Sequence, residues 1–122
     1  MNNMQFAVIG GDARQIWLAR ELAADGHTVR LFGFEKCEGD GPRPEKTIAK
    51  AVGMADVVIL PFPSQNEQGW LNAPFAAEQI SPEEVLDAVP KTALVVAGRV
   101  LPELAQMAKE RKLELIDYGL RE

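Results

Sequence analysis

The most constraining feature of this sequence is an apolar run that leads straight into two glycines. The run Phe6–Ile9 is followed by Gly10, Gly11 and Asp12. A short apolar run bounded by glycine is typical of a buried parallel strand, and aspartate is a favoured N-cap residue of a helix. A strand, a tight turn and a helix are therefore predicted within residues 5–25.

The same alternation of strand and helix continues along the chain. Further strands are predicted over residues 28–32, 56–60, 92–97 and 113–116. Proline is favoured in the first turn of a helix, and glycine just after its end. The other helices are therefore predicted to begin at Pro44, Pro82 and Pro102, with Ser81 as the N-cap of the second and Gly53 as the end of the first.

Strands that alternate with helices predict a three-layer α/β fold, flavodoxin-like or Rossmann-like, with helices on both faces of the sheet. The predicted sheet is parallel and five-stranded, in the order 2-1-3-4-5. Residues 1–122 are expected to form a single domain, because no internal boundary or repeat is visible.

Composition and charge exclude several classes of function. The chain carries 18 acidic and 13 basic residues, for a net charge of −5, and no basic stripe that would indicate nucleic-acid binding. Its apolar runs are too short to span a membrane, and its first residues do not form a secretory signal. One cysteine, Cys37, and one histidine, His27, predict neither an intrachain disulfide nor a metal site. A cytoplasmic protein is expected.

The segment between residues 61 and 79 is unusually long for a loop in a compact domain. It contains three prolines and the aromatic residues Phe62, Trp70 and Phe75. Exposed aromatic side chains in such a loop indicate either a lid over a site or a contact with another domain or subunit.

Three turns of the predicted sheet end neighbouring strands and should form one rim at the carboxyl edge. Helix N-termini favour anions, and arginine binds carboxylates in a planar fork, so Arg14 and Arg99 are predicted to hold two carboxylates of one small molecule. In the alternative interpretation, Arg14 pairs with Asp12 and Arg99 is a solvated surface residue. The predicted substrate-binding residues are Gly10, Gly11, Asp12, Arg14, Gln15, Ser64, Gly98 and Arg99.

The first turn does not match the known nucleotide-binding loops. It lacks the third glycine of the dinucleotide fingerprint and places Asp12 where a pyrophosphate would approach. No cofactor is therefore expected in this chain. Asp12 is also a candidate general base by its position, although capping the helix is the alternative role.

The residues Ala7–Gln15, the strand end Val57–Pro61 and the long glycine-containing loop resemble the N-terminal domain of the dipicolinate synthase A subunit. The resemblance implies a substrate-side domain, with NADP or NAD bound by a C-terminal Rossmann domain that this chain lacks. It implies oxidation of dihydrodipicolinate to dipicolinate in the mother cell of a sporulating bacterium, with the dipicolinate synthase B subunit as partner. The domain alone is then expected to be inactive, and apolar surface that the second domain covers would favour self-association.

Two interpretations from other functional classes remain open beside this one. The first is a non-catalytic flavodoxin-like module that docks a partner through Trp70 and its loop. The second is a Rossmann domain that binds a nucleotide through a divergent glycine turn.

Overall fold

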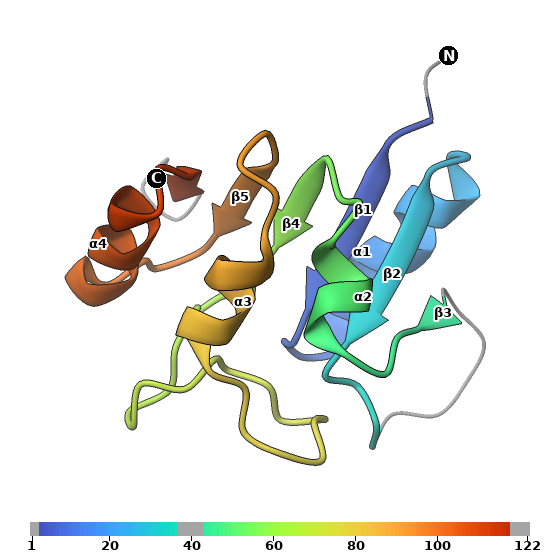
Figure 1. Cartoon of the computed structure of the whole chain (residues 1–122). Coiled ribbons are helices and arrows are strands. Elements are labelled where there is room, and N and C mark those ends of the chain that lie inside the picture. Colours follow the sequence, from blue (N-terminus) through green and yellow to red (C-terminus); the bar gives the residue numbers. More distant parts are fainter. Residues whose placement is uncertain (1–2, 37–42, 118–122) are drawn as a thin grey trace.

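The computed structural model describes residues 3–36 and 43–117, and these form a parallel sheet between two layers of helices (Figure 1). The strands are β1 (Gln5–Ile9), β2 (Thr28–Phe32), β3 (Arg43–Pro44), β4 (Val57–Ile59), β5 (Leu94–Ala97) and β6 (Glu114–Asp117). The helices are α1 (Ala13–Ala24), α2 (Ile48–Val52), α3 (Pro82–Ala88) and α4 (Pro102–Glu110).

The order of the strands in the sheet is β3-β2-β1-β4-β5-β6, and all neighbouring pairs are parallel. Without the short edge strand β3, this is the predicted order 2-1-3-4-5. The sheet reverses its direction of growth between β1 and β4, and the carboxyl edge at such a switch point is where doubly wound folds bind ligands.

Most of the predicted element ends are confirmed by their caps. Asp12 caps α1 by accepting a hydrogen bond from the backbone N–H of Arg14, and Ser81 caps α3 in the same way through Glu84. Gly53 is the C-cap of α2, and Pro82 and Pro102 lie in the first turns of their helices. Each cap satisfies a backbone group that the end of a helix leaves unpaired.

The predicted start of the second helix is wrong. Pro44 lies in β3, and α2 begins at Ile48 with Thr47 as its N-cap. Thr47 caps the helix by accepting from the backbone N–H of Lys50 at 3.1 Å, whereas Pro44 is paired with Leu31 in the sheet. Cys37 and the other residues from 37 to 42 lie outside the described residues.

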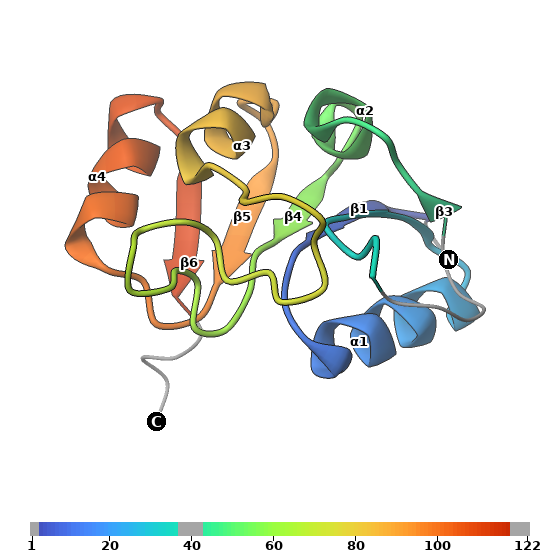
Figure 2. The same cartoon turned by 90° about the horizontal axis from the view of Figure 1, so that it is seen from below.

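The two helical layers cover the sheet unequally. Helices α2, α3 and α4 lie on one face and α1 alone lies on the other, among the described elements (Figure 2). The larger core lies among β1, β4, β5 and the three-helix layer, where Val58, Leu60, Val95 and Leu104 are fully buried. The smaller core lies beneath α1, around Val8 and Ala19. Burying a side chain as large as valine or leucine contributes about 1.5–3 kcal/mol, so the three-helix side carries most of the hydrophobic stabilisation.

The long segment after β4 is folded rather than extended into solvent. Its Leu71 is 2% exposed and its backbone N–H donates to Ile80 O, while Asn72 N–H donates to Ser64 O. Phe62, Trp70 and Phe75 are all partly buried, so the expectation of exposed aromatic residues in this segment is wrong.

Candidate functional site

The turns after β1, β4 and β5 meet at the carboxyl edge of the sheet, as predicted. Ser64 joins two of them, because its backbone N–H donates to Gly98 O at 2.8 Å and its hydroxyl donates to Arg99 O at 3.2 Å. A third link comes from Arg14, whose Nη2 donates to Phe62 O at 3.0 Å. Residues far apart in the sequence are thereby held in one contiguous rim.

The backbone donors of the glycine turn are already used within the chain. Gly10 N–H donates to Phe32 O at 2.8 Å and Gly11 N–H donates to Asn72 O at 2.9 Å. Gly10 has a φ of +69°, and a Cβ on it would lie 3.1 Å from the Cβ of Ala73. The glycines therefore let the chain's own loop approach β1 closely, and this turn does not fit a pyrophosphate, which needs those donors.

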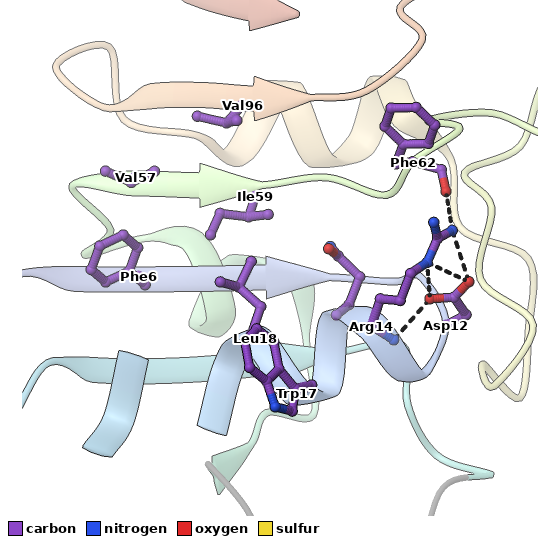
Figure 3. A pocket seen from close by; sticks show the side chains of 10 residues that line it. Phe6, Asp12, Arg14, Trp17, Leu18, Val57, Ile59, Phe62 and Val96 are labelled. Carbon is purple, nitrogen blue, oxygen red and sulfur yellow. Dashed lines mark hydrogen bonds and ion pairs between the residues drawn. The ribbon is translucent and has the colours of Figure 1, made fainter. Parts of the chain in front are cut away.

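Asp12 and Arg14 form a close pair at the start of α1 (Figure 3). Arg14 Nε lies 3.2 Å from both carboxylate oxygens of Asp12, and Nη2 lies 3.0 Å from Oδ2. The hydrogen bond from the Arg14 side chain is the main reason that the pKa of Asp12 lies below its ordinary value of 3.8. The pairing that the alternative interpretation expected for Arg14 is thus present.

The guanidinium of Arg14 also lies over the ring of Phe62, with its carbon 5.9 Å from the ring centroid. Phe62 in turn packs against the backbone of Gly98 so closely that a Cβ on this glycine would overlap the ring. The side chain of Arg14 is 68% exposed, so its outer edge still faces solvent. A cation held in this way combines an ion pair with a stacking contact.

Two of the predicted site residues hold the rim together from inside. Gln15 is 7% exposed and its amide donates to Leu60 O at 3.3 Å, while Ser64 is 0% exposed. Both buried polar groups are satisfied by backbone oxygens, as burial requires. Their contacts are structural, and a contact with substrate stays a prediction.

Arg99 is the second cation of the rim and it is exposed. Its φ of +53° is unusual for a residue other than glycine, and the Ser64 hydroxyl holds the carbonyl group of this residue. Uncommon backbone conformations of this kind recur at functional sites. Arg14 and Arg99 are thus the two predicted arginines whose side chains reach the surface of the rim.

A groove of about 690 Å³ lies beside α1, on the sheet face opposite the three-helix layer (Figure 3). Apolar and aromatic side chains make most of its lining, and Asp12, Arg14 and Gln15 lie at one end. The sequence did not predict this groove. Trp17, one of its lining residues, is 64% exposed.

A signal for the groove was present in the sequence. Residues 57–60 and 94–97 are apolar at every position, which indicates strands buried on both faces, whereas α1 is the single described helix on its face.

Within residues 3–36 and 43–117, no three histidine, cysteine or acidic side chains cluster as metal ligands. None of the helices in these ranges is long and apolar enough to cross a bilayer.

Comparison with curated proteins identifies one relative by name. The chain is 25% identical over 123 residues to the A subunit of dipicolinate synthase from Bacillus subtilis (strain 168). The alignment covers 96% of this chain and 41% of that relative, so this chain spans about two fifths of its length.

Solved structures give the same likeness. The A chain of dipicolinate synthase from Bacillus subtilis matches with a TM-score of 0.80 and 25% identity, over 96% of this chain and 40% of that one. The dipicolinate synthase A subunit from Bacillus halodurans matches with a TM-score of 0.81 and 26% identity, over 98% of this chain and 41% of that one.

A third structure shares the fold alone. It is a D-isomer specific 2-hydroxyacid dehydrogenase family protein from Klebsiella pneumoniae 342, with a TM-score of 0.59 and 15% identity over 90% of this chain and 35% of that one.

The model of one protein family, the N-terminal domain of the dipicolinate synthase A subunit, matches residues 5–119. This chain therefore belongs to the family of N-terminal domains of the dipicolinate synthase A subunit.

Proposed function

We propose that this chain forms the substrate-side part of an NAD(P)-dependent dehydrogenase that oxidises dihydrodipicolinate to dipicolinate during sporulation. The observation that carries the proposal is the family match over residues 5–119. In this reaction the dihydropyridine ring gives a hydride to the nicotinamide and a proton to a base, and it becomes an aromatic pyridine.

In this proposal the rim recognises the two carboxylates of the substrate. Arg14 at the start of α1 and Arg99 in the turn after β5 present guanidinium groups, and Phe62 from the turn after β4 packs against Gly98 and beneath Arg14. Guanidinium groups bind carboxylates through paired hydrogen bonds. The remaining predicted residues shape the rim: Gly10, Gly11, Asp12, Gln15, Ser64 and Gly98.

We assign the nicotinamide to a separate Rossmann domain outside residues 1–122. The engaged donors of Gly10 and Gly11 support this division, because the first turn does not fit a dinucleotide. On this view residues 1–122 are one N-terminal domain that binds and orients substrate but does not turn it over alone. No step of the reaction is assigned to Asp12, since a carboxyl with a lowered pKa is a poor proton acceptor at neutral pH.

The partners proposed for the complete enzyme are the B subunit of dipicolinate synthase and the dicarboxylate substrate, in the cytoplasm of the mother cell. The relatives are named as one lettered subunit of a synthase, which supports an assembly of more than one subunit.

The two alternative functions, partner docking through Trp70 and nucleotide binding through the glycine turn, are not favoured by the contacts of the described residues. The side chain of Trp70 is partly buried, and the N–H groups of Gly10 and Gly11 already donate to Phe32 O and Asn72 O.

Thermal-shift titration with pyridine-2,6-dicarboxylate tests the binding site. The ligand should raise the melting temperature of the wild-type chain, and Arg14→Ala and Arg99→Ala should each remove most of the effect. Arg20→Ala is the matched control, because it removes an exposed arginine from the same helix but outside the rim. No shift, or a shift that both rim variants retain, would contradict the assignment. Stabilisation by NADP without an effect of the dicarboxylate would favour a nucleotide-binding domain.

Asp12→Asn gives a sharper test of the same site. The Asp12 carboxylate neutralises Arg14, so a bound dicarboxylate must compete with it. Asparagine keeps the capping oxygen but removes the charge. Asp12→Asn should therefore bind pyridine-2,6-dicarboxylate more tightly than wild type, and weaker binding would show that Asp12 contacts the ligand itself.

A further inference from the structure

Arg99 has a left-handed backbone conformation that the turns after β1 and β2 give to glycine. Its φ is +53°, whereas the residues of positive φ in those two turns are Gly10, Gly11 and Gly33. Glycine adopts this conformation at no steric cost, and other residues adopt it only with strain. Among the described residues only Lys112 shares the feature, and it follows the end of α4, where a left-handed residue is common. An arginine in a turn that favours glycine therefore points to a use for its side chain.

Hydrogen bonds hold both of the peptide groups that flank Arg99. In the first group, Gly98 O accepts from the backbone N–H of Ser64 at 2.8 Å. In the second group, Arg99 O accepts from the Ser64 hydroxyl at 3.2 Å, and Val100 N–H donates to Asp117 Oδ2 at 2.9 Å. Because peptide groups are planar, the orientations of these two groups set φ and ψ of Arg99. The three contacts therefore fix the direction of its Cα–Cβ bond, from which the guanidinium extends.

Ser64 and Asp117 reach the turn of Arg99 from two other parts of the sheet edge. Ser64 is 0% exposed in the segment after β4, and its own carbonyl oxygen accepts from Asn72 N–H at 3.1 Å. Asp117 is the last residue of β6 and pairs with Ala97, the last residue of β5. The turn after β5 is thus held from the β4 side by one residue and from the β6 side by the other.

The two arginines of the rim differ in their surroundings. Arg14 is paired with Asp12 at 3.0 Å, whereas no described residue forms a hydrogen bond or an ion pair with the exposed guanidinium of Arg99. A bound carboxylate must compete with Asp12 at Arg14, but it meets no described competitor at Arg99. Paired hydrogen bonds between a guanidinium and a carboxylate require a fixed geometry, so binding at Arg99 depends on where its backbone holds the side chain.

We propose that Ser64 and Asp117 are positioning residues for the recognition of one substrate carboxylate, because they hold Arg99 in the conformation that directs its guanidinium to the rim. The inference rests on the dicarboxylate site proposed above. It gives Ser64 a role that acts through Arg99 rather than through contact with substrate, and it adds Asp117 to the residues on which the site depends. Holding a binding group in place before the ligand arrives lowers the cost of ordering it.

NMR of the chain without ligand tests whether the two residues hold Arg99. A positive φ brings the amide hydrogen and the α hydrogen of one residue close together, so Arg99 should give a strong NOE between them. Ser64→Ala and Asp117→Ala should each weaken this NOE, because Arg99 then populates negative φ values. Asp117→Asn keeps an acceptor for Val100 N–H and should preserve it. An NOE that stays strong in either alanine variant would overturn the proposed role of that residue.

Calorimetric titration with pyridine-2,6-dicarboxylate tests the consequence for binding. Ser64→Ala should weaken binding about tenfold, the order expected when a fixed contact must be ordered by the ligand. In an Arg99→Ala background it should have no further effect, because Ser64 acts through Arg99. Asp117→Ala should bind about tenfold more weakly than Asp117→Asn, which has the same charge. Ser81→Ala is the matched control, since it removes a hydroxyl that caps α3 and should leave binding unchanged.

The outcomes distinguish this proposal from the dicarboxylate site itself. If the wild-type chain does not bind the dicarboxylate, the proposed function fails, and the NOE alone decides whether Ser64 and Asp117 hold Arg99. If it binds, an equal loss from Ser64→Ala with and without Arg99 would overturn the role of Ser64, and equal binding by the two Asp117 variants would overturn that of Asp117. Circular dichroism checks that each variant is folded. Asp117 is only partly buried, so its two variants test the proposal even if Ser64→Ala does not fold.

Discussion

Asp12 and Arg14 are joined by both backbone and side-chain hydrogen bonds. The carboxylate of Asp12 accepts from the backbone N–H of Arg14 at 2.9 Å and from Arg14 Nη2 at 3.0 Å. One side chain thus begins helix α1 and neutralises a cation at the carboxyl edge of the sheet. The two roles are separable, because asparagine can cap the helix as aspartate does but carries no charge to neutralise Arg14.

Asp12→Asn and Asp12→Ala should differ in their effect on stability. Asparagine keeps the cap and loses an exposed ion pair, so the free energy of unfolding should fall by no more than about 1 kcal/mol. Alanine also removes the cap, which should cost about 1 kcal/mol in addition. Urea unfolding at neutral pH measures both. Equal losses would show that Asp12 does not act as a cap.

The stability contributed by the charge of Asp12 should depend on pH in one direction. Its pKa in the folded chain is lowered from 3.8, mainly by the Arg14 side chain, so folding favours the charged form. The stabilisation by this charge is complete at pH values above 3.8, the ordinary pKa. It is lost as the pH falls through the lowered pKa of Asp12 in the folded chain. Unfolding free energies of wild type and Asp12→Asn, measured from about pH 7 down to about pH 2, should therefore converge in acid. A difference that stays constant with pH would assign the effect of the substitution to something other than charge.

Gly98→Ala should destabilise the rim through Phe62. The new Cβ would overlap Phe62 Cδ2 and lie 2.8 Å from Phe62 Cβ, so the ring must move away. Overpacking of this kind costs about 1–3 kcal/mol. In a Phe62→Ala background the same substitution should cost much less, which a double-mutant cycle of unfolding free energies measures. Additive effects would mean that the clash is relieved elsewhere.

Val95→Ala and Val96→Ala form a matched pair on one strand. Val95 is 0% exposed beneath the three-helix layer, whereas Val96 faces the groove beside α1 and is partly exposed. Loss of two buried methyl groups should cost about 2 kcal/mol at Val95 and less than about 1 kcal/mol at Val96. Guanidinium unfolding compares the two variants. Equal costs would show that the α1 side of β5 is covered in solution.

Local sequence signals determined most of the architecture. The apolar run before Gly10 placed β1, Asp12 and Ser81 placed the starts of α1 and α3, and the alternation of strand and helix predicted the order of the central strands. These signals work because caps and buried parallel strands depend on a few neighbouring residues. The same logic placed α2 wrongly, because Pro44 pairs with Leu31 across the sheet as part of β3, a contact that is distant in sequence.

Only part of the candidate site could be predicted from the sequence. Arg14 and Arg99 could be placed at the same edge of the sheet once the strand order was predicted. The use of the Gly10 and Gly11 donors could not be predicted, because it depends on Phe32 and Asn72, which reach this turn only in the folded chain.

Residue patterns were enough to place the four described helices and the described strands except β3, although not the start of α2, and to indicate that β4 and β5 are apolar on both faces. The packing of the folded chain decided that half of one sheet face has no helix over it among the described residues, and that Trp17 borders the gap. The physical reason is that the pattern of apolar residues reflects the environment that each side chain prefers. Its actual burial depends on which helix or strand packs against that face of the sheet in the folded chain. Ile116 shows the difference, because it is a strand residue of strong apolar preference that is nevertheless 39% exposed.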